Sequence, residues 1–119
     1  MKYISIVNIQ KFQFFSALFL AFNLAGAQKI YSVDYASQAD IKVFVVDYQS
    51  QADLNVFKVN YQSQAKGNEG LWYFVDYKSQ SDKTIFFVDY KSQADLLIYF
   101  VDYQSQAKWN NRSKSHLLY

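Results

Sequence analysis

The chain repeats six times a segment that reads Val46-Asp47-Tyr48-Gln49-Ser50-Gln51-Ala52-Asp53 in its second copy. The copies begin at Val33, Val46, Val59, Val75, Val88 and Val101. Their spacing is constant within the first three copies and within the last three, and only the step from Val59 to Val75 is longer. Because each copy contributes the same structural unit to a shared core, this repeat decides the fold.

Each repeat divides into a strand and a turn. The residues around the repeat Val, as in Leu96–Tyr103, are mostly β-branched or aromatic, and such residues favour strands. Seven strands are predicted, at about 30–35, 41–48, 54–61, 71–77, 84–90, 96–103 and 116–119. The predicted fold class is therefore all-β, with about seven short strands built from 13-residue repeats in two pseudo-equivalent halves.

The alternation along these strands predicts which face is buried. One face carries an aromatic residue, the repeat Val and the repeat Tyr, for example Phe44, Val46 and Tyr48, so we assign it to the core. The opposite face, with Val43 and Val45, is expected to be half-buried. The repeat Tyr residues could instead form a platform for sugars or a partner; we expect them to pack in the core with the hydroxyl at the rim.

The turn Gln49–Asp53 and its equivalents contain no Gly or Pro, which disfavours the common two-residue hairpin turns. The Ser-x-x-Asp spacing predicts one turn of right-handed helical backbone, with the Ser hydroxyl and the Asp carboxylate accepting backbone N–H groups. A parallel crossover usually needs a dozen or more residues. We therefore expect strands that are consecutive in sequence to run antiparallel or to cross at an angle.

The six copies also form two half-units of three, at about 30–70 and 71–119, because each Val of the first half recurs at a constant offset in the second half. The third and sixth copies end in Ala-Lys, at Lys66 and Lys108, and a longer polar stretch follows each. This second level of repetition predicts a two-lap path in which the second half lies against the first.

Residues 1–27 have the pattern of a secretory signal peptide. Lys2 and Lys11 precede an apolar stretch from Phe12 to Leu24, and Ala25-Gly26-Ala27 supplies the small residues of a cleavage site. The apolar stretch is shorter than the roughly 20 residues that span a bilayer, so a membrane anchor is the less favoured interpretation.

Cleavage is predicted between Ala27 and Gln28, which leaves a single domain, 28–119, in a secreted or periplasmic location without a membrane span. Of the 12 basic residues, two lie in the signal, so ten basic residues face ten acidic ones in the mature domain. This balance gives no field that would attract nucleic acid. The chain has no cysteine, so its stability rests on packing and topology.

Catalytic chemistry has little support in the sequence. The mature domain has one His, His116, and one Glu, Glu69. Ser115, His116 and a repeat Asp could be assembled into a triad on paper, but triads are recognised by geometry. We interpret His116 as an ordinary strand-end residue and predict no catalytic residue and no cofactor.

A calcium site is the sharper alternative. Carboxylates recur at the turns, and calcium takes six to eight oxygen ligands. The Gly-rich spacing of calcium-binding β-rolls is absent, and Asp at turns usually caps backbone. The candidate metal ligands are Asp40, Asp53, Asp82 and Asp95.

The two long polar loops are the candidate contact surfaces, since loops commonly carry function. Trp109 could contact a partner there, or it could cap the open end of the core. The candidate contact residues are Lys66, Asn68, Glu69, Lys108, Trp109 and Arg112.

The repeat, the Ala-Lys endings at Lys66 and Lys108, and the C-terminal Leu117-Leu118-Tyr119 resemble the septknot family of short bacterial repeat proteins. The resemblance covers about Ile30 to Tyr119. It implies an all-β chain tied in a seven-crossing torus knot, which agrees with a two-lap path. It implies no established activity and supplies no catalytic residues.

Together these observations predict a small exported repeat protein that acts as a stable structural or binding module and is a monomer. The alternative from another class is an extracellular self-assembling, fibre-like protein, because aromatic strands without Pro can pair at their edges. A calcium-binding module or a hydrolase is a more distant alternative.

Overall fold

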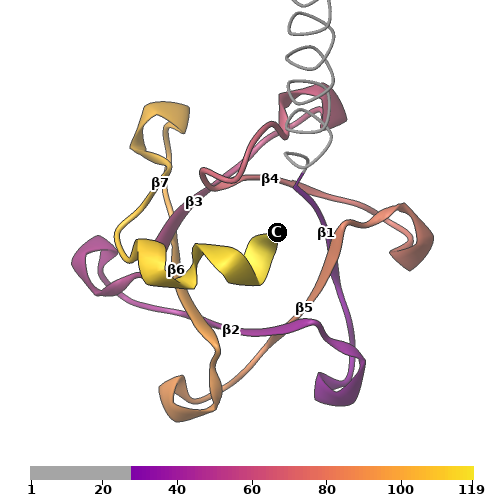
Figure 1. The fold of residues 1–119 in the computed structure, drawn as a ribbon, viewed down its shortest axis with the longest axis horizontal. Coiled ribbons are helices and arrows are strands. Elements are labelled where there is room, and N and C mark those ends of the chain that lie inside the picture. The colour runs from indigo at the N-terminus through magenta and orange to yellow at the C-terminus, as the bar shows by residue number, and fades with distance from the viewer. Residues whose placement is uncertain (1–27) are drawn as a thin grey trace, which may run out of the picture.

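A computed structural model describes residues 28–119, so the predicted signal peptide and its cleavage lie outside the described residues. Six parallel strands close into a barrel, and a seventh pairs antiparallel with the start of the third (Figure 1). The strands are β1 (Lys29–Ser32), β2 (Ile41–Val45), β3 (Leu54–Lys58), β4 (Leu71–Phe74), β5 (Lys83–Phe87), β6 (Leu96–Phe100) and β7 (Lys108–Trp109). Within 28–119, no helix has the length and apolar character needed to cross a membrane.

A single 3-10 turn follows each of the first six strands, as the Ser-x-x-Asp spacing predicts. These turns are η1 (Ala36–Gln38), η2 (Gln49–Gln51), η3 (Gln62–Gln64), η4 (Lys78–Gln80), η5 (Lys91–Gln93) and η6 (Gln104–Gln106). The predicted capping by Ser is wrong, because Gln51 N donates instead to the Tyr48 carbonyl at 3.0 Å, and the other copies do the same.

The predicted terminal strand 116–119 is also wrong. Residues Arg112–Leu118 form the longer 3-10 helix η7, which lies across the ring with the C-terminus near its centre (Figure 1). The seventh strand is instead β7, which lies immediately after the sixth copy of the repeat.

The two halves of the chain interleave around the barrel. The strand order is β4-β1-β5-β2-β6-β3, and β3 pairs with β4 to close the ring. Consecutive strands of one half are thus always separated by a strand of the other half. This confirms the two-lap path, whereas the prediction that consecutive strands run antiparallel or cross at an angle is wrong: all six barrel strands run parallel.

The register explains how such short links join parallel strands. Ser32 at the end of β1 and Ile41 at the start of β2 both pair with Ile85, on opposite sides of β5. Three other links follow the same rule, in that the end of one strand and the start of the next pair with the two sides of a single residue. That residue is Ile98 for the link from β2 to β3, Ile30 for the link from β4 to β5, and Val43 for the link from β5 to β6. The link therefore crosses one strand, about 10 Å, and need not return along the length of a strand. The usual crossover length assumes that return.

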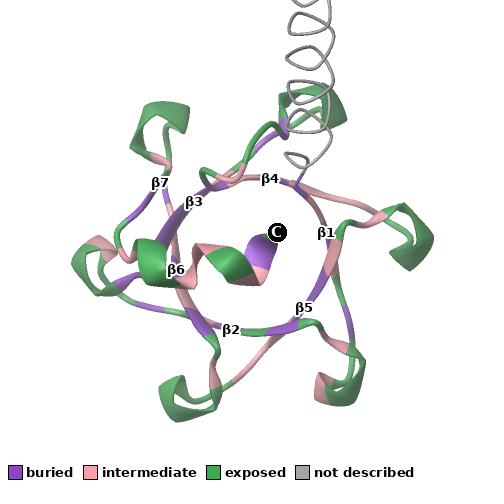
Figure 2. Cartoon of the chain, viewed as in Figure 1, coloured by how far each residue is buried: buried purple, intermediate pink, exposed green. Residues whose placement is uncertain are grey.

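The barrel interior is filled by layers that take one inward residue from each strand. The middle layer is fully buried and consists of Ile30, Val43, Val56, Trp72, Ile85 and Ile98. The assignment of the aromatic–Val–Tyr face to the core is wrong: Val43 faces inward, Phe44 is only half-buried and Tyr48 is exposed. The repeat Val of that face is buried or half-buried in every copy. Figure 2 shows the buried ring and the exposed segments outside it.

The end of the barrel where the strands begin is covered by the C-terminal segment. Ile41, Leu54 and Leu96 at this end are buried in one cluster with Trp109 and Leu118. The buried Gln28 side chain donates to the Leu118 carbonyl at 3.0 Å. Thus η7 closes this end of the core.

Two glycines give a matched test of how β3 and β4 are joined. Gly70 has φ +90°, and an added Cβ would overlap the Asn55 carbonyl oxygen and lie 3.2 Å from Leu54 Cδ1, whereas Gly67 has φ +66° and open space around it. Gly70→Ala is expected to lower the free energy of unfolding by at least about 3 kcal/mol, and Gly67→Ala by roughly 1–2 kcal/mol from backbone strain alone. Denaturant unfolding measures both, and equal losses would contradict the close approach at Gly70.

Candidate binding surface

Six largely exposed segments, which we call the lobes, project from the ring. Each runs from the repeat Asp to the repeat Gln, at 34–38, 47–51, 60–64, 76–80, 89–93 and 102–106. The lobe Tyr side chains are between 67% and 69% exposed in all six copies: Tyr35, Tyr48, Tyr61, Tyr77, Tyr90 and Tyr103. The prediction that these Tyr residues pack in the core is therefore wrong. The physical reason is that the sheet ends before the repeat Val, so the two-residue alternation does not continue to Tyr.

A backbone hydrogen bond from the repeat Val anchors each lobe to a strand of the other lap, and in four copies a second bond holds the far end of the lobe. In the second copy, Val46 N donates to the Ile98 carbonyl at 2.9 Å, and Asp53 N donates to the Leu97 carbonyl at 2.8 Å. Both acceptor carbonyls lie on β6, a strand of the other lap. The first, fourth and fifth copies form the same two bonds, each pair to a single strand of the other lap. Because both of their ends are fixed to neighbouring residues of one strand, the lobes of these four copies have a defined position on the barrel.

The turn Asp residues complete these anchors. The Asp53 carboxylate accepts a hydrogen bond from Leu97 N at 2.9 Å, so the two residues bond each other in both directions. The equivalent bonds, each at 2.9 Å, join Asp40 to Thr84 N, Asp82 to Lys29 N and Asp95 to Lys42 N. The carboxylate thus caps a strand of the other lap, and not its own turn as the spacing predicted.

The four candidate metal ligands are not brought together by the fold. Asp40, Asp53, Asp82 and Asp95 each bond a different strand segment. Across 28–119, no three acidic, His or Cys side chains gather in a way that could hold a metal ion. The arrangement supports a structural role for these carboxylates.

The lobes differ from one another mainly at one position. The residue after Tyr is Ala36, Gln49, Gln62, Lys78, Lys91 or Gln104. Tyr, Ser and Gln are identical in all six copies, and Asp is replaced once, by Asn60. For the described residues, the hydrogen bonds include none from a side chain of a lobe Asp, Tyr or Ser. Side-chain hydrogen bonds therefore do not explain why Asp, Tyr and Ser recur in the lobes.

The predicted contact residues of the two long loops mostly contact each other. Trp109 is buried, and its Nε1 donates to the Asn68 carbonyl at 2.7 Å. Arg112 forms an ion pair with Glu69 at 3.1 Å. Asn68, Glu69, Trp109 and Arg112 thus join the third-copy loop to the C-terminal segment, whereas Lys66 and Lys108 are exposed.

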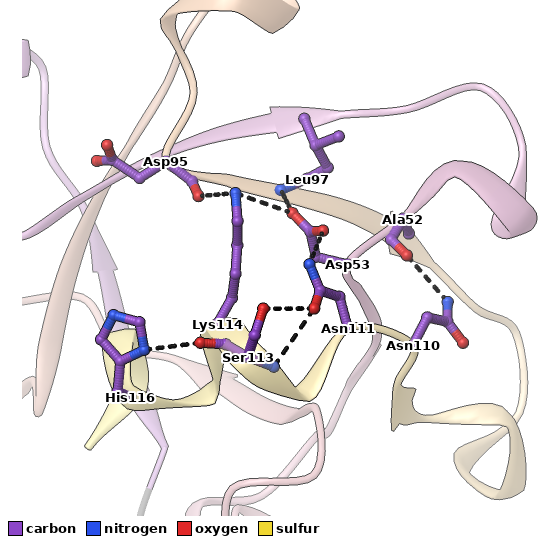
Figure 3. Close-up of polar contacts among 9 residues, drawn as sticks. All are labelled: Ala52, Asp53, Asp95, Leu97, Asn110, Asn111, Ser113, Lys114 and His116. Carbon is purple, nitrogen blue, oxygen red and sulfur yellow. Dashed lines mark hydrogen bonds and ion pairs between the residues drawn. The ribbon is translucent and has the colours of Figure 1, made fainter.

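The segment that contains His116 forms polar contacts that fix η7 to the barrel (Figure 3). Lys114 Nζ donates to the Asp95 carbonyl at 2.8 Å and lies 3.6 Å from the Asp53 carboxylate. Within 28–119, the hydrogen bond of the exposed His116 ring is to the Ser113 carbonyl at 3.0 Å, whereas a triad would join the ring to a hydroxyl and a carboxylate. This geometry gives the segment a structural role.

The inward residues at the end where the strands finish form a layer that was not predicted from the sequence. This layer consists of Ser32, Val45, Lys58, Phe74, Phe87 and Phe100, all exposed or half-buried. Lys58 Nζ lies 4.4 Å from the ring centroid of Phe100 and 5.5 Å from that of Phe74, so its charge is held over aromatic faces. The residue type at this strand position varies between copies, and this variation was the feature of the sequence that could have pointed to the layer.

The match to a family model shows which family the chain represents, and the winding of the barrel agrees with it. A family model described as a 7(1) septoil knot domain matches residues 27–110. The chain belongs to the septknot family. The interleaved laps of this septknot domain fit a seven-crossing knot, which confirms the resemblance and the knotted all-β fold. Comparisons with curated proteins and with solved structures gave no match.

Two aspartates of the fourth repeat, Asp82 and Asp76, test whether the turn carboxylate stabilises the fold by binding a strand of the other lap. Asp82→Ala removes the carboxylate that accepts from Lys29 N, and we expect a loss of roughly 1–2 kcal/mol of unfolding free energy, because this bond is charge-assisted but exposed. Asp76→Ala, in the lobe of the same repeat, should change stability by less than about 0.5 kcal/mol. Thermal or urea unfolding of both variants checks this, and a larger effect at Asp76 would reverse the assignment.

Proposed function

We propose that the protein is an exported binding module in which a knotted barrel presents six equivalent lobes to a partner outside the cytoplasm. The observation that carries this proposal is the uniform exposure of the lobe Tyr residues, 67% to 69% in six copies. A large aromatic ring left in water six times is a contact group, because Tyr supplies much apolar area together with a hydroxyl.

The rigidity of the barrel supports the same proposal. Each lobe is closed by its own backbone bonds, such as Gln51 N to the Tyr48 carbonyl, and is anchored to a buried strand. A ligand that binds the lobes would not have to order them. Binding to a preorganised surface keeps affinity that a flexible loop would lose to ordering entropy.

The fibre-like alternative has less support from the architecture. Self-assembly through strands requires unpaired edges. The strands β1–β6 pair on both sides around the closed ring, and β7 is a very short strand, Lys108–Trp109. We therefore propose a monomer with no nucleic-acid partner, in keeping with its balanced charge.

Export is tested with the full chain expressed in a bacterial host. The protein should be recovered outside the cytoplasm with Gln28 as its first residue, as intact-mass spectrometry can show. A Lys2→Glu/Lys11→Glu variant should remain in the cytoplasm uncleaved, because the positive start of a signal peptide directs insertion. Cytoplasmic recovery of the uncleaved wild-type chain would contradict export.

Binding is tested by retention on the envelope and extracellular-matrix fractions of the producing cells. Replacing the six lobe Tyr residues by Ser should abolish retention while leaving the melting temperature within a few degrees, since these side chains lie outside the core. Tyr119→Ser is the matched control, because Tyr119 is 69% exposed and lies outside the lobes. Retention that is equal in all three proteins, or absent in the wild type, would overturn the binding role.

A further inference from the structure

We infer that the lobes bind a neutral polysaccharide, with several lobes engaging one polymer. This inference rests on the proposed function and names the chemistry of its partner. It follows from three properties of the lobes: the groups that surround each Tyr, the charge of the lobes, and their repetition around a ring.

Each lobe combines an exposed aromatic ring with nearby amide and hydroxyl groups and, in five copies, a carboxylate. Gln64 Oε1 lies 3.2 Å from Tyr61 N, and Gln106 Oε1 lies 3.3 Å from Tyr103 N, so the Gln side chain folds back against the base of its Tyr. In these lobes the amide NH₂ group remains available as a donor. A sugar ring has an apolar C–H face and a rim of hydroxyls, which match an aromatic face bordered by such groups.

The charge of the lobes selects against acidic polymers. Five of the six lobes carry a carboxylate next to the Tyr, and only the lobes of Lys78 and Lys91 carry a basic residue. Like charges placed together oppose binding, so nucleic acids, acidic polysaccharides and anionic lipids are poor partners for this surface. A neutral polymer meets no such repulsion.

The isolation of the Tyr residues selects against a protein partner. Protein interfaces have a contiguous, well-packed apolar centre. Here each lobe offers one aromatic ring with exposed polar side chains around it, and the lobes are separate projections around the ring (Figure 2).

Because the lobe is repeated six times, weak binding at each lobe can add up to strong binding of one polymer. A single exposed Tyr with a few hydrogen-bonding groups binds a short sugar weakly. Once one lobe has bound a polymer, its next repeating units are held near the neighbouring lobes at high effective concentration, and avidity can exceed single-site affinity by roughly 10²–10⁴-fold. Lobes that are neighbours on the ring belong to alternate laps, so this array exists only in the folded barrel.

The inference is tested by affinity gel electrophoresis of the mature protein in cellulose derivatives, xylan, glucomannan and soluble starch, with polygalacturonate as the acidic arm. At least one neutral polymer should retard the wild type and Tyr119→Ser equally. The variant with Ser at Tyr35, Tyr48 and Tyr61 should require about ten-fold more polymer, and the six-lobe variant should migrate freely. A hexasaccharide of the same sugar should compete only at about a hundred-fold higher concentration of sugar units.

A second arm separates this inference from the proposed function. Envelope and matrix fractions are treated with periodate, which cleaves sugar diols, or with a protease, before the retention assay. Loss of lobe-dependent retention after periodate alone supports the polysaccharide. Loss after protease alone, or retardation only by polygalacturonate, overturns it while the lobes remain a binding surface. The absence of any lobe-dependent retention or retardation overturns both.

Discussion

Everything in this structure depends on the backbone pairing between the two laps. Each barrel strand of one lap finds its hydrogen-bond partners only on strands of the other lap, and the pair β3–β4 that closes the ring follows the same rule. Without the other lap, the three strands of one lap would be separated from one another, and their backbone N–H and C=O groups would be unpaired. Such unpaired groups are unfavourable when buried. The core layer around Val43 and Ile85 is complete only when the second lap lies between the strands of the first. Neither half is therefore a stable unit that the remaining chain could simply cover.

The two places where the repeat is broken are the places where this pairing pattern has to end. After the third copy the chain must enter the gap beside β3, and the longer spacing with Gly70 against Asn55 permits that close approach. After the sixth copy no gap remains. The chain reverses, and Trp109 pairs antiparallel with Leu54. The Asp that caps a neighbouring strand in four copies is Lys at both positions, Lys66 and Lys108, and Lys108 instead pairs with Asn55 as part of β7.

The sequence predicted the all-β class, the helical turn and the two laps, because these follow from periodicity and turn chemistry that each repeat carries locally. It did not predict the direction of the strands. That depends on Ser32 and Ile41 meeting the same residue of β5, a register between segments that lie far apart in the sequence. The buried face was missed for a related reason. The two-residue alternation along a strand separates its two faces, but it does not say which face is buried when both are apolar. Val43 and Phe44 are both apolar, and only the closure of the barrel decides which of them faces inward. The lobes were missed because the strand pattern was extended through Tyr48.

Separating the roles of the repeat residues shows what the fold needs and what it does not. The inward residues and the repeat Val are buried or partly buried in most copies, and the turn Asp anchors a strand of the other lap. These residues would recur for structural reasons alone. Tyr, Ser and Gln are exposed, yet they recur as faithfully as the buried Val, whereas the residue between Tyr and Ser, which is exposed in most copies, varies from Ala36 to Lys78. Duplication alone would let all exposed positions drift alike. The proposed binding role of the lobes would account for this contrast within one turn, because the side-chain hydrogen bonds of the domain do not account for the recurrence of Tyr and Ser.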